Sequence, residues 1–245
     1  MRNDSRACMK HIISCCLLTT LIFVLSGCQV SPTATKENTI IEPALSPVPK
    51  LPITGADHYS ISPNQSEIRI LVYKGGPLAK FGHNHVMLAK QVTGDIYETS
   101  SLHDSAFILS FPVEKIEIDP PDARAQEGKE FDTRPSPEAI DGTRKNMLGP
   151  EVLDAEHYPD ITIRSAGFYG PDKNTRAKIQ ITMHGVTREL STPVSIEQYG
   201  STLTADGKMI IRTSDFGIKP FSVLGGGLQV QDEVKIRFHI VAEKT

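Results

Sequence analysis

The chain has 245 residues, with 26 Lys and Arg against 29 Asp and Glu, so its formal net charge is −3. This charge gives no electrostatic reason to bind nucleic acid, and the length allows one or two domains with a sizeable core. The sequence also offers no cluster of acid, base and nucleophile, so we expect no enzyme activity.

Residues 1–27 contain, in order, the basic, apolar and small-residue segments of a bacterial lipoprotein signal peptide. Three basic residues precede an apolar run from Ile12 to Leu25, and the chain continues Ser26-Gly27-Cys28. At about 14 residues this run is short for a membrane span, which takes about 20. Leu25-Ser26-Gly27-Cys28 resembles a lipobox, in which Cys28 is acylated and becomes the new N-terminus. The alternatives are ordinary secretory cleavage and an uncleaved anchor.

Removal of this leader would leave Cys28 as the last of the four cysteines. The mature chain would then have no disulfide in an oxidising compartment, and no thiol for catalysis or for a zinc site. Three basic residues and Asp4 leave with the leader, so 23 basic and 28 acidic residues remain, a net charge of −5.

Residues 28–56 contain five prolines among small and polar residues. No apolar period appears, and proline interrupts both helices and strand ladders. We expect a semi-extended tether that spaces a domain from a membrane. Gln29, where inner-membrane retention would favour Asp, makes the outer membrane the expected site by resemblance to lipoprotein sorting. The domain would lie on the periplasmic side of the cell envelope.

From residue 57 to 245 the apolar residues alternate with period two, which predicts strands. A first strand around Ile68 to Val72 ends at Gly75, and residues 86–97 predict a second strand that bends at Gly94. Residues 103–113 predict a third strand.

Between residues 122 and 159 the period changes. Ser136 followed by Pro137 and Glu138 is typical of a helix start, and Gly149-Pro150 would end this helix. A second short helix is expected over residues 151–156.

Strands then resume, with an antiparallel hairpin over residues 177–190 that turns at Gly185. A strand over residues 203–212 and a clean alternation from Val234 to Ile240 follow. About eight strands with one or two short helices predict a mainly β fold, a single closed antiparallel barrel.

Three passages, in order, resemble one family. They are residues 146–161 (NML…DAEHYPDI), Met183-His184-Gly185-Val186-Thr187 and residues 212–218 (RTSDFGI). Together they are similar to the YceI-like, polyisoprenoid-binding family over residues 57–243. The resemblance implies a lipocalin-like barrel whose apolar lumen holds a long isoprenoid chain in an exported bacterial protein.

The strand parities predict which side chains face the lumen. Burial of each methylene is worth about 0.8 kcal/mol, so a long chain in an apolar tunnel needs no polar anchor. The alternative is a structural domain whose core is filled by its own side chains. The residues expected to face inward and to contact a lipid are Phe107, Leu109, Phe111, Ile179, Ile181, Met183, Ile236 and Phe238.

Phe81-Gly82-His83-Asn84-His85 carries the other candidate chemistry. Residues i and i+2 of a strand point the same way, so His83 and His85 could bind one metal ion in a metal-binding or redox module. His103 or His184 would be needed as a third ligand. The alternative is a pair of polar residues that contact loops or a lipid headgroup.

The expected partners are an isoprenoid-type lipid in the lumen and a membrane reached through acylated Cys28. No cofactor is established by the sequence, and a homodimer is left open. The expected function is storage, shielding or transport of the lipid at the cell envelope.

Overall fold

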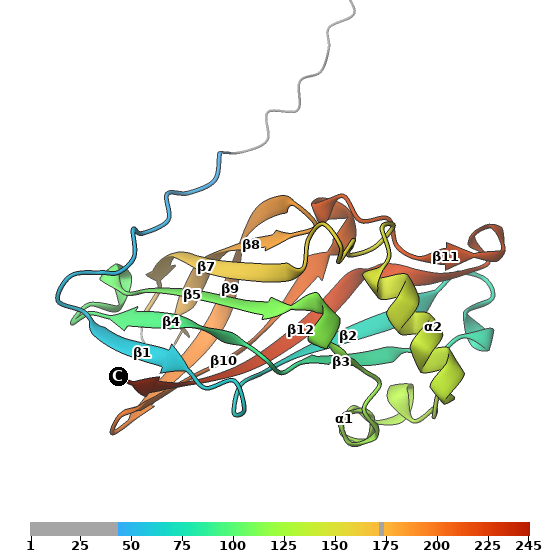
Figure 1. Cartoon of the computed structure of the whole chain (residues 1–245), viewed down its shortest axis with the longest axis horizontal. Coiled ribbons are helices and arrows are strands. Elements are labelled where there is room, and N and C mark those ends of the chain that lie inside the picture. The colour runs from blue at the N-terminus through green and yellow to red at the C-terminus, as the bar shows by residue number, and fades with distance from the viewer. Residues whose placement is uncertain (1–43, 172–173) are drawn as a thin grey trace, which may run out of the picture. The chain divides into compact units, whose positions relative to one another are not determined.

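The computed structural model describes residues 44–171 and 174–245. The predicted signal peptide, Cys28 and the first part of the tether lie outside the described residues. Within them the chain forms twelve strands and two α-helices (Figure 1). The strands are β1 (Asp57–Ile61), β2 (Glu67–Gly75), β3 (His85–Ala89), β4 (Thr93–Glu98), β5 (Ala106–Pro112), β6 (Glu117–Ile118), β7 (Asp160–Tyr169), β8 (Arg176–Met183), β9 (Val186–Tyr199), β10 (Thr202–Arg212), β11 (Ser222–Val223) and β12 (Leu228–Lys244). The helices are α1 (Pro121–Ala125) and α2 (Pro137–Leu148).

Eight antiparallel strands close into a barrel in the order β1-β4-β5-β7-β8-β9-β10-β12. The ring closes where β12 pairs with β1, with Tyr59 opposite Lys244. Further along β12, its pairing with β2 continues the sheet through β3 to β6. The predicted fold, mainly β with a single closed antiparallel barrel and one or two short helices, is confirmed.

The hairpin of β8 and β9 shows how the sequence pattern builds the barrel. Ala177, Ile179, Ile181 and Met183 are all buried, as alternation predicts. The chain reverses at His184 and Gly185, whose φ angles of +51° and +72° fit the left-handed pair of a type I′ turn. A Cβ at Gly185 would lie 2.7 Å from the ring of Tyr158, so this turn requires glycine.

Two predicted strands have different bounds in the structure. Residues 86–97 form two strands, because β3 pairs with β2 and β6 whereas β4 pairs with β1 and β5. The two strands are separated by residues 90–92, just before Gly94. Val92 is fully buried and fixes this connecting segment to the core. The third predicted strand begins at Ala106, since His103 lies in a short 3₁₀ turn.

Helix α2 begins as predicted, with Pro137 in its first turn and the Ser136 hydroxyl accepting from the amide of Ala139 at 3.3 Å. The helix expected over residues 151–156 is wrong. That segment forms tight turns around Asp154, whose φ of +47° is incompatible with a right-handed helix. The second helix is α1, which begins at Pro121.

The end of the tether contacts the outside of the barrel. The amide and the hydroxyl of Ser46 donate to the two carboxylate oxygens of Glu189 at 2.7 and 2.9 Å. Gln180 Nε2 donates to the Ser46 carbonyl at 2.6 Å, and Lys178 Nζ donates to its hydroxyl at 3.3 Å. The chain is therefore fixed to β8 and β9 at Ser46, eleven residues before β1 begins.

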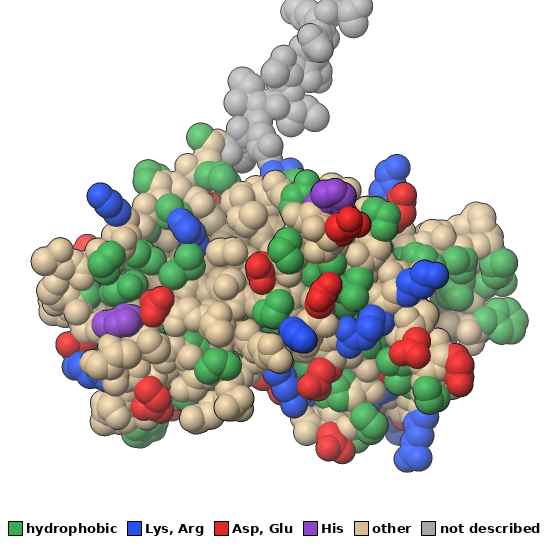
Figure 2. Space-filling model, viewed as in Figure 1, with side chains coloured by type: hydrophobic (Ala, Val, Ile, Leu, Met, Phe, Trp, Pro, Cys, Tyr) green, Lys and Arg blue, Asp and Glu red, His purple; other side chains and the backbone are tan. Residues whose placement is uncertain are grey.

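Charged side chains of both signs are interspersed on the visible face in Figure 2, without a patch of a single sign. Among the described residues, no helix combines the length and the apolar character needed to cross a membrane.

Candidate functional site

Two cavities lie inside the described part of the barrel. The larger cavity has a volume of about 220 Å³ and is lined by residues of β2, β3, β5, β7, β8, β10, β12 and α2. The smaller cavity has a volume of about 100 Å³. Ile68, Ile163 and Met209 line both cavities, so these three side chains form the boundary between them.

The structure places all eight predicted lumen residues on the cavity walls. The larger cavity is lined by Phe111, Ile181, Met183 and Ile236. The smaller cavity is lined by Phe107, Leu109, Ile179 and Phe238. Contact of these residues with a lipid stays a prediction.

A few polar side chains line the larger cavity as well. They are His85, Thr143, Asn146, Thr213 and Lys219. Sequence reasoning missed Thr143 and Asn146 as lining residues because the alternation argument covered strands only, and both lie on helix α2. It missed Lys219 because this residue lies in a loop.

The polar residues that line the smaller cavity are Glu98, Ser105 and Thr192. The hydroxyl of Tyr59 donates to Glu98 Oε2 at 2.8 Å and accepts from Gln198 Nε2 at 2.7 Å. Burial and the hydrogen bond to this carboxylate raise the pKa of Tyr59 to about 12. The phenol therefore stays protonated, and it holds Glu98 in place.

His83 and His85 lie side by side, as the spacing predicts, with ring centroids 4.5 Å apart. Asn84, between them, is turned into the surrounding structure. Its side-chain oxygen accepts from the amide of Lys74 at 3.0 Å, and its side-chain nitrogen donates to the carbonyl of Glu130 at 2.9 Å. These bonds fix the backbone that carries the two imidazoles.

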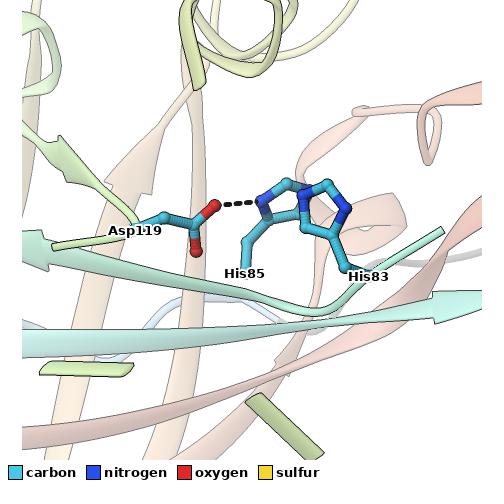
Figure 3. A group of neighbouring side chains, drawn as sticks. All are labelled: His83, His85 and Asp119. Carbon is cyan, nitrogen blue, oxygen red and sulfur yellow. Dashed lines mark hydrogen bonds and ion pairs between the residues drawn. The ribbon is translucent and has the colours of Figure 1, made fainter. Parts of the chain in front are cut away.

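Asp119 completes the cluster (Figure 3). One carboxylate oxygen accepts from His85 Nδ1 at 2.7 Å. The other accepts from the amide of Val86 at 2.9 Å and from Arg124 at 2.5 Å. Burial alone would raise the pKa of Asp119, but the bonds from His85 and Val86 and the charge of Arg124 hold this pKa below its ordinary value.

His83 differs from His85 in having no such partner. Its Nε2 atom is buried and makes no hydrogen bond within the described residues. Burial, and next the charge of His85, lower the pKa of His83 below its ordinary value.

Asp119 was not found from the sequence, because it lies 34 residues beyond His85 and only the pairing of β6 with β3 brings it close.

The two histidines considered as a third ligand lie elsewhere. His103 is in the turn before β5, and His184 Nδ1 lies 3.2 Å from the carbonyl oxygen of Phe216. Within the described ranges, the group that could share one ion is His83, His85 and Asp119.

Comparison with known proteins gives one family and several structural matches. The model of the YceI-like domain family matches residues 59–242. BcnA of Burkholderia cenocepacia is 17% identical, with a TM-score of 0.55 over 74% of this chain and 98% of that chain. A polyisoprenoid-binding domain from Saccharophagus degradans, implicated in plant cell wall breakdown, is 12% identical, with a TM-score of 0.50 over 76% of this chain and 98% of that one. No curated protein matches. At these identities the solved structures show a shared fold.

Proposed function

Because this chain belongs to the YceI-like domain family, we propose that its barrel binds one long isoprenoid-type lipid. The observation that carries this proposal is the pair of apolar cavities that meet at Ile68, Ile163 and Met209 inside the closed barrel. A slender apolar chain fits a tunnel of this kind better than a compact polar molecule does. The polyisoprenoid named for the Saccharophagus degradans domain is a ligand of that class.

The free energy of apolar burial favours a lipid in this interior. A lipid that buries ten methylenes would gain about 8 kcal/mol. The cavity volume of about 220 Å³ supports a ligand-binding interior over the alternative of a structural domain with a filled core.

The rest of the proposal places this binding at the cell envelope. Residues 1–27 are a signal peptide, acylated Cys28 anchors the mature chain, and residues 28–56 tether the domain of residues 57–245. The domain faces the periplasm, with the outer membrane favoured by Gln29. There it stores, shields or transports the lipid as a binding protein, without catalysis.

The test is the lipid content of the native protein. Full-length protein purified in mild detergent from its own membranes is extracted with organic solvent, and the extract is analysed by mass spectrometry. We expect one isoprenoid-type lipid per chain. Protein that is folded and carries no lipid, or that carries only the phospholipids of the membrane in their bulk proportions, would refute the proposal.

A matched pair of variants assigns the lipid to the barrel interior. Met209 lies at the boundary of the two cavities, and its neighbour Ile210 is exposed on the same strand. Met209→Trp should obstruct the tunnel and reduce the extracted lipid, whereas Ile210→Trp should retain it. Equal lipid in both folded variants would contradict an interior site.

A further inference from the structure

We propose that His83 and His85 bind one divalent transition-metal ion, such as Zn²⁺, and that Asp119 orients His85 for this role. The proposal rests on the arrangement of the three side chains, which come from two segments of the chain and lie in a row (Figure 3). The metal site does not depend on lipid binding; only the identity of the molecule that fills its open positions does.

The tautomer of His85 supports this proposal. An ionised Asp119 accepts hydrogen bonds and donates none, so its bond of 2.7 Å to Nδ1 places the imidazole proton on that nitrogen. The lone pair of His85 is then on Nε2, the atom left for a metal ion. A carboxylate behind a histidine in this way fixes the ring and makes it a stronger ligand. Arg124 and the amide of Val86 hold the carboxylate in turn.

The role of Asp119 follows from the same contacts. Both of its oxygens already accept hydrogen bonds, and the whole residue is buried. Direct coordination by Asp119 would compete with the His85 bond at one oxygen and with the bonds from Val86 and Arg124 at the other. Asp119 is therefore a positioning residue, and the two imidazoles are the ligands.

The unpartnered nitrogen of His83 also supports a metal ion here. A buried polar atom without a hydrogen bond has lost its bond to water, so it destabilises the fold unless a ligand satisfies it. His83 Nε2 is buried and has no partner within the described residues. The ligand atoms, one each from His83, His85 and Asp119, lie within 4.8 Å of one another, and the two imidazole ring centroids are 4.5 Å apart. Two nitrogens bound to one zinc ion, each about 2.0–2.1 Å from it, are at most about 4.2 Å apart, so two imidazoles this close can reach one ion by rotating their rings.

The ligand types indicate the metal. Imidazole suits Zn²⁺, Cu²⁺, Ni²⁺ and Co²⁺, whereas Mg²⁺ and Ca²⁺ prefer oxygen ligands. Two histidines leave two of the four zinc positions open. His85 lines the larger cavity, so these positions are accessible from it to water or to an oxygen atom of a bound molecule. That the molecule is the oxygen-bearing end of the lipid rests on the proposed function.

The other histidine–carboxylate pairs provide a matched control. His239 Nδ1 lies 2.7 Å from Asp206, the same distance as in the His85–Asp119 pair. His239 is half exposed, and no second imidazole of the described residues lies beside it. Substitution of a histidine that only forms an ion pair, such as His239, should leave metal binding unchanged. Substitution of a histidine that binds the metal should weaken metal binding.

The experiment uses full-length protein in detergent, without a histidine tag, after removal of metals with a chelator. Zn²⁺ is titrated by calorimetry, and Co²⁺ is followed by its visible absorption spectrum. We expect one Zn²⁺ per chain and an intense Co²⁺ spectrum typical of a four-coordinate site with nitrogen ligands. His83→Ala and His85→Ala should each weaken binding at least 100-fold, while His239→Ala should leave it unchanged.

Asp119→Asn should weaken Zn²⁺ binding about 10- to 100-fold and leave the stoichiometry at one, as expected for a residue that orients a ligand. Each variant is checked for folding by circular dichroism. If any variant unfolds, the Co²⁺ spectrum of the unaltered protein decides. Absence of that spectrum, or stoichiometric Zn²⁺ binding that survives both histidine substitutions, overturns the proposal. The extracted lipid of the same samples is measured separately, so failure of the metal site and failure of lipid binding give different results.

Discussion

Phe238 on β12 lies directly opposite Gly207 on β10, and its ring occupies the space that a side chain at position 207 would need. Phe238 also lines the smaller cavity. The glycine therefore lets an aromatic side chain lie flat against the sheet, and it leaves room beyond the ring for the cavity.

Gly207→Ala should destabilise the protein by about 1–3 kcal/mol, the usual cost of overpacking. The added methyl group would overlap the Phe238 ring and lie 2.6 Å from the carbonyl oxygen of Pro193, so rotation of the ring alone cannot accommodate it. Denaturant unfolding measures the change. Gly142→Ala on α2 is the control, because nothing lies within 4 Å of its Cβ and alanine favours a helix; this variant should be slightly stabilised. Equal effects of the two substitutions would contradict this account.

Ile181→Asp should remove lipid binding or unfold the domain. The side chain is 3% exposed and lines the larger cavity, so the substitution places a carboxylate among aliphatic groups at a cost of several kcal/mol. Ile210→Asp is the matched control, because Ile210 is 57% exposed on β10 and should tolerate the charge. Thermal melting and extracted lipid are the measurements. An Ile181→Asp protein that melts normally and retains lipid would show that the cavity wall is wrongly assigned.

Cys28→Ser should release the protein from membranes. The mature chain contains no second apolar run of the length of residues 12–25, and firm anchoring needs more than one acyl chain at this cysteine. Fractionation of cells followed by a high-salt wash measures the distribution, with unaltered protein as control. Continued sedimentation of the serine variant with membranes would be inconsistent with a lipoprotein.

Glu189→Gln should detach the chain at Ser46 from the barrel. Burial alone would raise the pKa of Glu189, but the hydrogen bonds from Ser46 and Gln180 and the charge of Lys178 hold this pKa below 4.5. Because the pKa of Glu189 is lowered in the folded protein, its contribution to docking is fully present above pH 4.5. This contribution is lost as the pH falls through the lowered pKa of the folded state.

Hydrogen exchange of residues 44–50 measures this docking. We expect Glu189→Gln to lose protection at neutral pH, measured against the intrinsic exchange rate, and the unaltered protein to lose the same protection once the pH falls below the lowered pKa of Glu189. Glu197→Gln, an exposed change on the same strand, should have no effect. If the two variants exchange alike, Glu189 does not hold the segment.

The sequence could predict those parts of the fold that depend on neighbouring residues. The alternation in β8, β10 and β12 has period two because each strand has one face on the cavities and one on solvent, and this pattern needs no knowledge of the partners. The serine cap and the proline of α2 are equally local.

The missed features depend on contacts between distant segments. Residues 86–97 were predicted as one strand because their apolar pattern continues, but pairing with different neighbours divides them at Val92. Helix α1 was not predicted, although Pro121 is well suited to the first turn of a helix. Asp119 belongs to the histidine cluster only through the pairing of β6 with β3.

If the barrel binds lipid as proposed, the shared boundary at Ile68, Ile163 and Met209 should make the number of molecules bound depend on their length. A lipid long enough to pass this boundary occupies both compartments and binds singly. One too short to cross it fills a single compartment and leaves a vacancy for a second copy. Titration with a series of prenyl chains would then show a change of stoichiometry from two to one at a particular number of isoprene units, and Met209, an unbranched side chain with several rotatable bonds, would set where that change occurs.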